Sequence, residues 1–145
     1  MKHLILVSHG SFAAGLKTSL SMFARDRIGQ VTAVGLADGM SVDDLAAEFS
    51  RQLDEEIPED AELVVLADIV GGSPLTTVCR VLGERGRLDQ AVVLGGMNLP
   101  MALNALVMMD VLPSEDLVST VLNESVSAVR EFSVSSDDDD DDDDI

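Results

Sequence analysis

The sequence predicts an α/β fold, with a doubly wound, mainly parallel sheet of four strands flanked by helices. Short apolar runs alternate with longer segments whose apolar residues recur every three or four positions, which is the pattern of β-α-β units around a parallel sheet. A chain of 145 residues that is 46% hydrophobic is the size of one domain and can bury a core. We therefore expect one domain at residues 1–134 and a tail at residues 135–145.

The first half of the chain predicts two strand–helix pairs. Residues 3–8 contain the continuous apolar run Leu4–Val7 and predict a strand, while residues 12–25 carry apolar side chains at helical spacing. Residues 31–36 are rich in β-branched and apolar side chains and predict the second strand. Ser41 then offers an N-cap with acidic residues after it, so a helix is expected from there to about residue 57.

The third strand–helix pair contains the most unusual turn of the chain. Residues 63–67 are uninterruptedly apolar, which predicts a buried strand, and Asp68 marks its end. The turn from Gly71 to Pro74 follows, in which the serine can cap a helix and the proline can take the first helical position. This helix is expected to run to about Leu82.

The remaining residues predict one more strand, two helices and a weaker final strand. Residues 90–94 form the fourth strand, and a Gly-Gly turn leads into a helix at about residues 98–109. Pro113 and the acidic residues after it open the last helix. Residues 131–134 are the weaker candidate for a short strand.

The charge of the chain excludes one class of partner. Its formal net charge is −18, and eight of the 27 acidic residues form the run Asp137–Asp144, which leaves 19 acidic against 9 basic residues elsewhere. Nucleic-acid binding needs a basic face, so we expect none. An acidic body suits a basic protein partner. We expect the tail to be disordered, because like charges repel and none can be buried.

Several common functional signatures are missing. The sequence has neither about 18 consecutive apolar residues nor a signal-peptide pattern, so we expect a cytoplasmic protein. The dinucleotide, phosphate-loop and nucleophile-elbow motifs are absent. Cys79 is the only cysteine and is expected to be a packed thiol, while His3 lies at the opposite end of its strand from His9. One cysteine and two histidines make no zinc set, so we expect no metal and no cofactor.

Side chains capable of chemistry gather at the carboxyl ends of the predicted strands, where open α/β sheets bind ligands. The residues at this edge are His9, Asp38, Asp68, Gly71 to Ser73 and Gly95 to Asn98. His9 and Asp68 become neighbours if the first and third strands pair. A carboxylate beside one ring nitrogen fixes the tautomer and leaves the other nitrogen as an aimed lone pair.

The turn after the third strand adds an anion site. Ser73 and the amides at the helix start can bind a negative group, and Gly71 and Gly72 let the backbone come close to a phosphate. Together with His9 and Asp68, these residues favour chemistry between a histidine and a phosphoryl group.

Three motifs then resemble one family. They are Ile-Leu-Val-Ser-His-Gly-Ser at 5–11, Ala-Asp-Ile-Val-Gly-Gly-Ser-Pro at 67–74 and Gly-Gly-Met-Asn-Leu-Pro-Met at 95–101. They are similar to the enzyme IIA component of the mannose-type (mannose, fructose, sorbose and N-acetylgalactosamine) phosphoenolpyruvate-dependent sugar phosphotransferase system. The likeness covers about residues 1–134.

The resemblance implies a phosphotransferase that carries a phosphoryl group on His9, taken from phospho-HPr and passed to a IIB component ahead of the membrane IIC and IID subunits. It implies that Asp68 bonds the ring nitrogen that carries no phosphate, and that Ser73 and nearby amides hold the phosphoryl oxygens. It also implies a homodimer in which a C-terminal strand is exchanged and lies antiparallel at the sheet edge, which would give residues 131–134 a partner.

Other functions stay open at this stage. The fold and the strand-end histidine also fit the phosphocarrier subunit of dihydroxyacetone kinase, although the Gly-Gly-Ser-Pro turn favours a sugar transporter. A regulatory binding module could be phosphorylated on His9 without onward transfer. A flavin-binding domain is disfavoured, because four Phe and no Trp or Tyr are available to stack on the ring.

Overall fold

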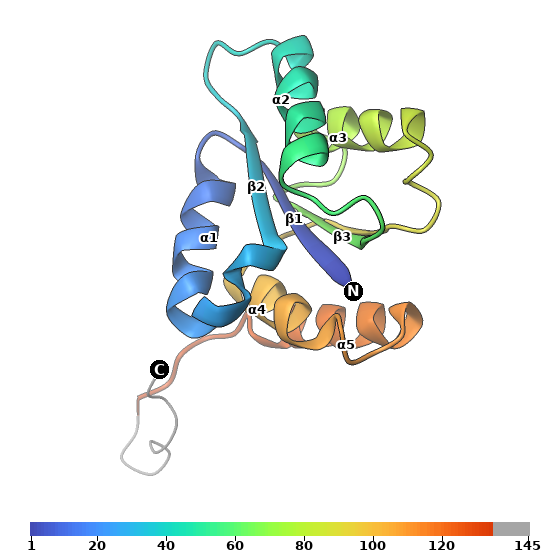
Figure 1. Cartoon of the computed structure of the whole chain (residues 1–145). Coiled ribbons are helices and arrows are strands. Elements are labelled where there is room, and N and C mark those ends of the chain that lie inside the picture. The colour runs from blue at the N-terminus through green and yellow to red at the C-terminus, as the bar shows by residue number, and fades with distance from the viewer. Residues whose placement is uncertain (135–145) are drawn as a thin grey trace.

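The computed structural model describes residues 1–134 and contains the predicted sheet. Its strands are β1 (Lys2–His9), β2 (Val31–Leu36), β3 (Glu62–Ala67) and β4 (Val92–Leu94). All neighbouring pairs are parallel, in the order β2-β1-β3-β4. The helices are α1 (Phe12–Phe23), α2 (Val42–Glu55), α3 (Ser73–Glu84), α4 (Leu99–Met108) and α5 (Ser114–Ser127), with a 3₁₀ helix η1 (Arg25–Gln30) (Figure 1). The doubly wound α/β prediction is confirmed.

Alternation along the central strand assigns the helices to two faces of the sheet. Leu4 and Leu6 of β1 are fully buried in a cluster with α1, α4 and α5. Ile5 and Val7 point to the other face, where they pack with α2 and α3. Figure 1 shows α2 and α3 together on one side and α4 and α5 on the other. Both faces of β1 are therefore covered, which explains its continuous apolar sequence.

The chain changes direction across the sheet between β1 and β3. β2 adds to one side of β1, and β3 then adds to the other, with Val7 level with Ala67. The amide of Asp68 donates to the carbonyl of Val7 at 3.0 Å, which carries the pairing one residue beyond β3. Such a topological switch point is where α/β sheets place their ligand sites.

The elements differ from the expectations in several places. The first helix ends at Phe23 rather than 25, because Ala24 leaves the helical region at φ −140° and η1 takes over. β4 begins at Val92 rather than 90. Residues 131–134 form neither helix nor strand, so the expected last strand is not formed in this chain alone. The Asp137–Asp144 run lies outside the described residues.

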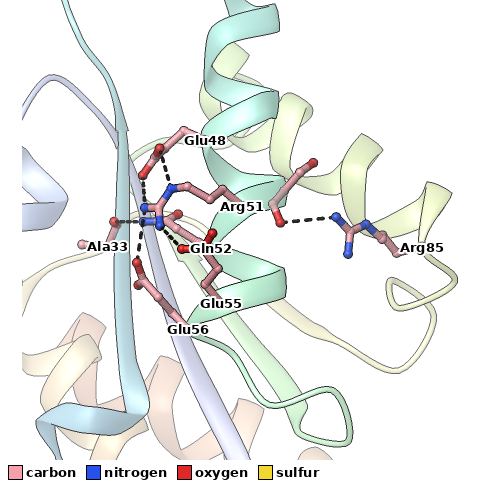
Figure 2. Close-up of polar contacts among 8 residues, drawn as sticks. Ala33, Glu48, Arg51, Gln52, Glu55, Glu56 and Arg85 are labelled. Atoms are coloured by element: carbon pink, nitrogen blue, oxygen red, sulfur yellow. Dashed lines mark hydrogen bonds and ion pairs between the residues drawn. The ribbon is translucent and has the colours of Figure 1, made fainter.

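Side chains of α2 cover the free edge of β2. The Nε2 of Gln52 donates to the carbonyl of Ala33 at 3.0 Å. Beside it, the Arg51 guanidinium makes ion pairs with three glutamates of α2 and its C-terminal end (Figure 2). The Gln52 bond occupies an acceptor of an edge that could otherwise pair with another strand. In the described part of the chain, no helix is long and apolar enough to span a membrane.

Candidate functional site

His9 and Asp68 meet at the ends of β1 and β3, as the pairing of these strands predicts. Oδ2 of Asp68 accepts the backbone N–H of His9 and lies 2.9 Å from its Nδ1. An ionised carboxylate can only accept, so Nδ1 carries the hydrogen of this bond. The other ring nitrogen, Nε2, then has the lone pair. The His9 side chain is 48% exposed and the Asp68 side chain is 16% exposed. The ring is therefore accessible to solvent, whereas the carboxylate behind it is largely covered.

The carboxyl of Asp68 is held in its ionised form. Partial burial by itself would raise its pKa, but the backbone and ring N–H of His9 and the amide of Ile69 all donate to the carboxylate. These hydrogen bonds outweigh burial and lower the pKa of Asp68 below its ordinary value. At neutral pH the site therefore pairs a carboxylate with the ring, and this arrangement stabilises positive charge on the imidazole.

The turn before α3 lies directly against the ring. A Cβ built on Gly72 would come within 2.9 Å of Cε1 of His9, so only a glycine allows this approach without a shift. Gly71 has φ +88°, a left-handed conformation that favours glycine. Both glycines expected at the site are therefore required by its geometry.

Ser73 is not the helix cap that the sequence predicts. Gly72 is the N-cap residue, with extended dihedrals, and its carbonyl accepts the amide of Thr76 at 3.0 Å. Ser73 is the first helical residue and is exposed. Because Gly72 has no side chain to cap with, the amides of Ser73 and Leu75 make no hydrogen bond within residues 1–134. The start of α3 therefore presents free donors beside the ring.

The other residues expected at this edge have different roles. Asn98 caps α4, with Oδ1 accepting the amide of Met101 at 2.8 Å. Gly95 lies under Val70, whose Cγ2 fills the space that a Cβ would take. Asp38 is exposed in the loop after β2 and makes no hydrogen bond to His9 in the described chain.

Ser8 has a role that no sequence pattern indicated. Its side chain is fully buried one residue before His9, and its Oγ accepts the amide of Ala13 at 2.7 Å. Ser11, the formal N-cap of α1, makes no side-chain cap bond. A strand residue therefore supplies the cap of the helix that follows the histidine, and this contact between the end of β1 and the start of α1 could not be inferred from spacing.

The remaining titratable groups singled out by the sequence are structural. His3 is 2% exposed at the far end of β1, with Nε2 2.8 Å from Oγ1 of Thr32. Its burial, with the charges of Lys17 and Arg87, lowers its pKa to about 4. Cys79 packs against the α2–α3 core, and burial raises the pKa of its thiol. Across residues 1–134, no group of three or more His, Cys, Asp or Glu side chains is arranged to hold a metal ion.

Comparison with known proteins gives consistent results along nearly the whole described chain. A family model described as "PTS system fructose IIA component" (EIIA-man) matches residues 3–122. The PTS system fructose-specific EIIA component of Bacillus subtilis (strain 168) is 30% identical over 137 residues, which are 94% of this chain and 88% of that protein.

Solved structures agree with the sequence matches. The mannose/sorbose specific IIA subunit of Enterococcus faecalis is 27% identical with a TM-score of 0.77, covering 93% of this chain and 98% of that one. The phosphotransferase system component EIIA of Streptococcus agalactiae is 28% identical with a TM-score of 0.76, covering 91% and 98%.

Proposed function

The chain belongs to the mannose-type family of enzyme IIA components of the sugar phosphotransferase system, and from that membership we propose that His9 is its phosphoryl-carrying residue. In this proposal His9 takes a phosphoryl group from phospho-HPr and passes it to a IIB component for carbohydrate uptake. The observation that carries it is the bond between Nδ1 of His9 and Asp68, which leaves Nε2 as the free, exposed nucleophile.

The transfer step follows from this geometry. The lone pair of Nε2 attacks phosphorus while the bond from phosphorus to the donor nitrogen breaks, and the electron pair of that bond returns to the donor. No proton has to leave His9, because Nδ1 keeps its hydrogen and donates it in the bond to Asp68. The ring becomes cationic as the N–P bond forms, and the adjacent carboxylate stabilises that charge. Asp68 thus orients the ring before transfer and stabilises it afterwards.

The start of α3 is proposed to hold the phosphoryl oxygens. The free amides of Ser73 and Leu75 and the Ser73 hydroxyl lie next to Gly72, which touches the ring. A helix N-terminus carries partial positive charge and favours anions. Phosphoryl transfer mainly needs alignment and stabilisation of equatorial charge, which these groups supply.

Two exposed apolar side chains, one three residues after His9 and one next to Asp68, suit protein partners. Phe12, at the start of α1, is 48% exposed, and Ile69, beside Asp68, is 52% exposed. With the acidic net charge, they form a rim that a basic donor protein and then a IIB acceptor could contact in turn.

A homodimer would complete the sheet at β4. Phe132 and Val134 are 85% and 84% exposed in the single chain, and an apolar groove of about 380 Å³ lies between the β4–α4 turn and α5. We propose that residues 131–134 of a second copy add as an antiparallel strand at this edge. Sedimentation velocity should show a dimer for the wild type and a monomer for Phe132→Asp. A wild-type monomer at micromolar concentration would rule the exchange out.

Phosphorylation assays test the central proposal. Incubation with enzyme I, HPr and phosphoenolpyruvate should label the protein with an acid-labile, base-stable phosphate, and His9→Ala should abolish the label although His3 remains. Addition of the cognate IIB should then remove the label from the wild type. Retention of the label with every IIB tested would instead favour a regulatory module, and an unlabelled wild type would refute the carrier role.

A further inference from the structure

The turn between β3 and α3 contacts His9 on one side and Gly95 on the other. On one side, Gly72 lies so close to His9 that an added Cβ would reach 2.9 Å from Cε1. On the other side, Val70 projects over Gly95, the first residue after β4. The same short turn therefore touches the reactive ring and the β4–α4 turn.

Gly95 provides a fixed surface for this contact. Leu94 is paired with Leu66 in the sheet, and the amide of Met97 donates to the carbonyl of Ala67 at 2.9 Å. These bonds tie the backbone on both sides of Gly95 to β3. Crowding at Gly95 would therefore be relieved by movement of the β3–α3 turn and not of the β4–α4 turn.

Val70 reaches the backbone of Gly95 directly. A Cβ at position 95 would overlap Cγ2 of Val70 and would lie 3.4 Å from its Cβ and its backbone nitrogen. The Val70 side chain is 78% exposed, so it is not held by enclosure in the core. Its contact with Gly95 therefore sets how closely it approaches the β4–α4 turn. An added methyl at 95 would lift Val70 and the backbone that continues to Gly72.

We propose that Gly95 is a positioning residue for phosphoryl transfer: by receiving the Val70 methyl, it sets the height of the Ile69–Ser73 turn, and so of the α3 amides, over the His9 ring. The inference rests on the proposed role of His9 as phosphoryl carrier. It assigns a function to a residue that follows β4, whereas His9 ends β1 and Asp68 follows β3.

A double-mutant cycle tests the contact, because Val70→Ala removes the methyl that Gly95→Ala would strike. In the otherwise wild-type chain, Gly95→Ala should slow transfer from phospho-HPr about 10- to 100-fold, the scale expected when a reacting group is misplaced by about 1 Å. In the Val70→Ala background the same change should alter the rate less than about twofold. Gly29→Ala is the matched control, because it lies before β2 and an added Cβ there would meet nothing within 4 Å.

A second measurement separates this inference from the proposed function. The Cε1–H resonance of His9 in proton NMR should move in Gly95→Ala and return toward its position in Val70→Ala when both changes are combined, whether or not HPr labels the protein. Sedimentation and thermal unfolding of each variant should show the wild-type assembly and a folded domain.

An unchanged rate and resonance in Gly95→Ala, or an equal effect in both backgrounds, would overturn the proposal. If Gly95→Ala alone does not fold, the double variant decides: a folded double variant with wild-type transfer supports the contact, and a double variant that is unfolded or slow overturns it.

Discussion

One oxygen of Asp68, Oδ2, accepts both the backbone amide and the ring Nδ1 of His9, each at 2.9 Å. The two bonds fix the ring relative to its own backbone, so a single carboxylate sets both its rotation and its tautomer. The same residue donates its amide to Val7 at the end of β1. Orientation of the His9 ring is thus an extension of the β1–β3 pairing.

Replacement of Asp68 by Asn should slow phosphorylation of His9 by about 10- to 100-fold, from the loss of a charge-assisted hydrogen bond worth about 1.5–3 kcal/mol. The amide of Asn can donate to Nδ1, which would place the ring hydrogen on Nε2 and remove the lone pair that attacks. Rapid-quench kinetics with phospho-HPr measure the effect. Asp38→Asn changes an exposed carboxylate at the same edge that makes no hydrogen bond to His9 in the described chain, and it should keep the wild-type rate. Equal rates for Asp68→Asn and wild type would remove Asp68 from the mechanism.

His3 predicts a pH dependence of stability that is independent of the site. Its pKa is about 4 in the folded chain, against about 6.5 when unfolded. The unfolded chain therefore binds more protons between these values, so the stabilisation is fully present above about pH 6.5 and is lost as the pH falls toward 4. Between about pH 7.5 and about pH 4.5, the free energy of unfolding of the wild type should fall by about 2 kcal/mol more than that of His3→Gln. Urea titrations at both pH values measure this difference, and parallel losses in the two proteins would contradict it.

Gln52 protects the edge of β2 through its donor atom alone. Its side chain is 6% exposed, Nε2 bonds to the Ala33 carbonyl, and Oε1 is buried without a hydrogen-bond partner among the described residues. Gln52→Glu replaces the donor with a buried negative charge facing that carbonyl, and it should cost about 3 kcal/mol of unfolding free energy at neutral pH. Gln52→Met removes both polar atoms of the side chain but leaves the Ala33 carbonyl without its donor, so it should cost about 1–2 kcal/mol, less than the buried charge.

The pH dependence of Gln52→Glu identifies the cause of its loss. A glutamate buried there would have a raised pKa, so the variant should regain stability relative to wild type as the pH falls and the carboxyl gains a hydrogen to donate. Chemical unfolding at about pH 7 and about pH 5 measures this recovery. Gln90→Glu, on the exposed turn before β4, should change little at either pH. Similar losses for the Glu and Met variants at neutral pH would show that the buried charge is not the cause of the Glu variant's loss.

The fold and the main pair of the site could be predicted from local patterns. Apolar runs that end in turns define parallel strands, and the carboxyl ends of parallel strands share one edge. His9 and Asp68 each follow such a run, so their proximity depends only on the pairing of β1 with β3. Burial on both faces is what made these strands recognisable in the sequence.

Contacts between turns could not be predicted in this way. Gly72 and Ser73 are both acceptable N-caps, and the choice of Gly72 depends on the His9 ring beside it. The contact of Val70 with Gly95 joins loops that follow different strands, and the spacing of apolar residues in the sequence does not predict it. The 3₁₀ helix η1 was missed because its residues carry no repeating apolar pattern. Each of these features is set by tertiary packing and not by local preference.

The start of α3 yields the last prediction, because Ser73 lies at the first helical position instead of the cap. Its hydroxyl and amide can both face an anion that the cap residue Gly72 cannot bind through a side chain. Ser73→Ala removes only the hydroxyl, so transfer to His9 should slow about three- to tenfold, equivalent to one hydrogen bond of about 0.5–1.5 kcal/mol. The backbone amides keep the rest of the site.

Thr76→Ala is the control for helix propensity, because Thr76 is also exposed in the first turns of α3. This variant should match wild type. Wild-type transfer by Ser73→Ala would assign the anion site to the amides alone, and an equal slowing in Thr76→Ala would trace the effect to the helix and not to the hydroxyl.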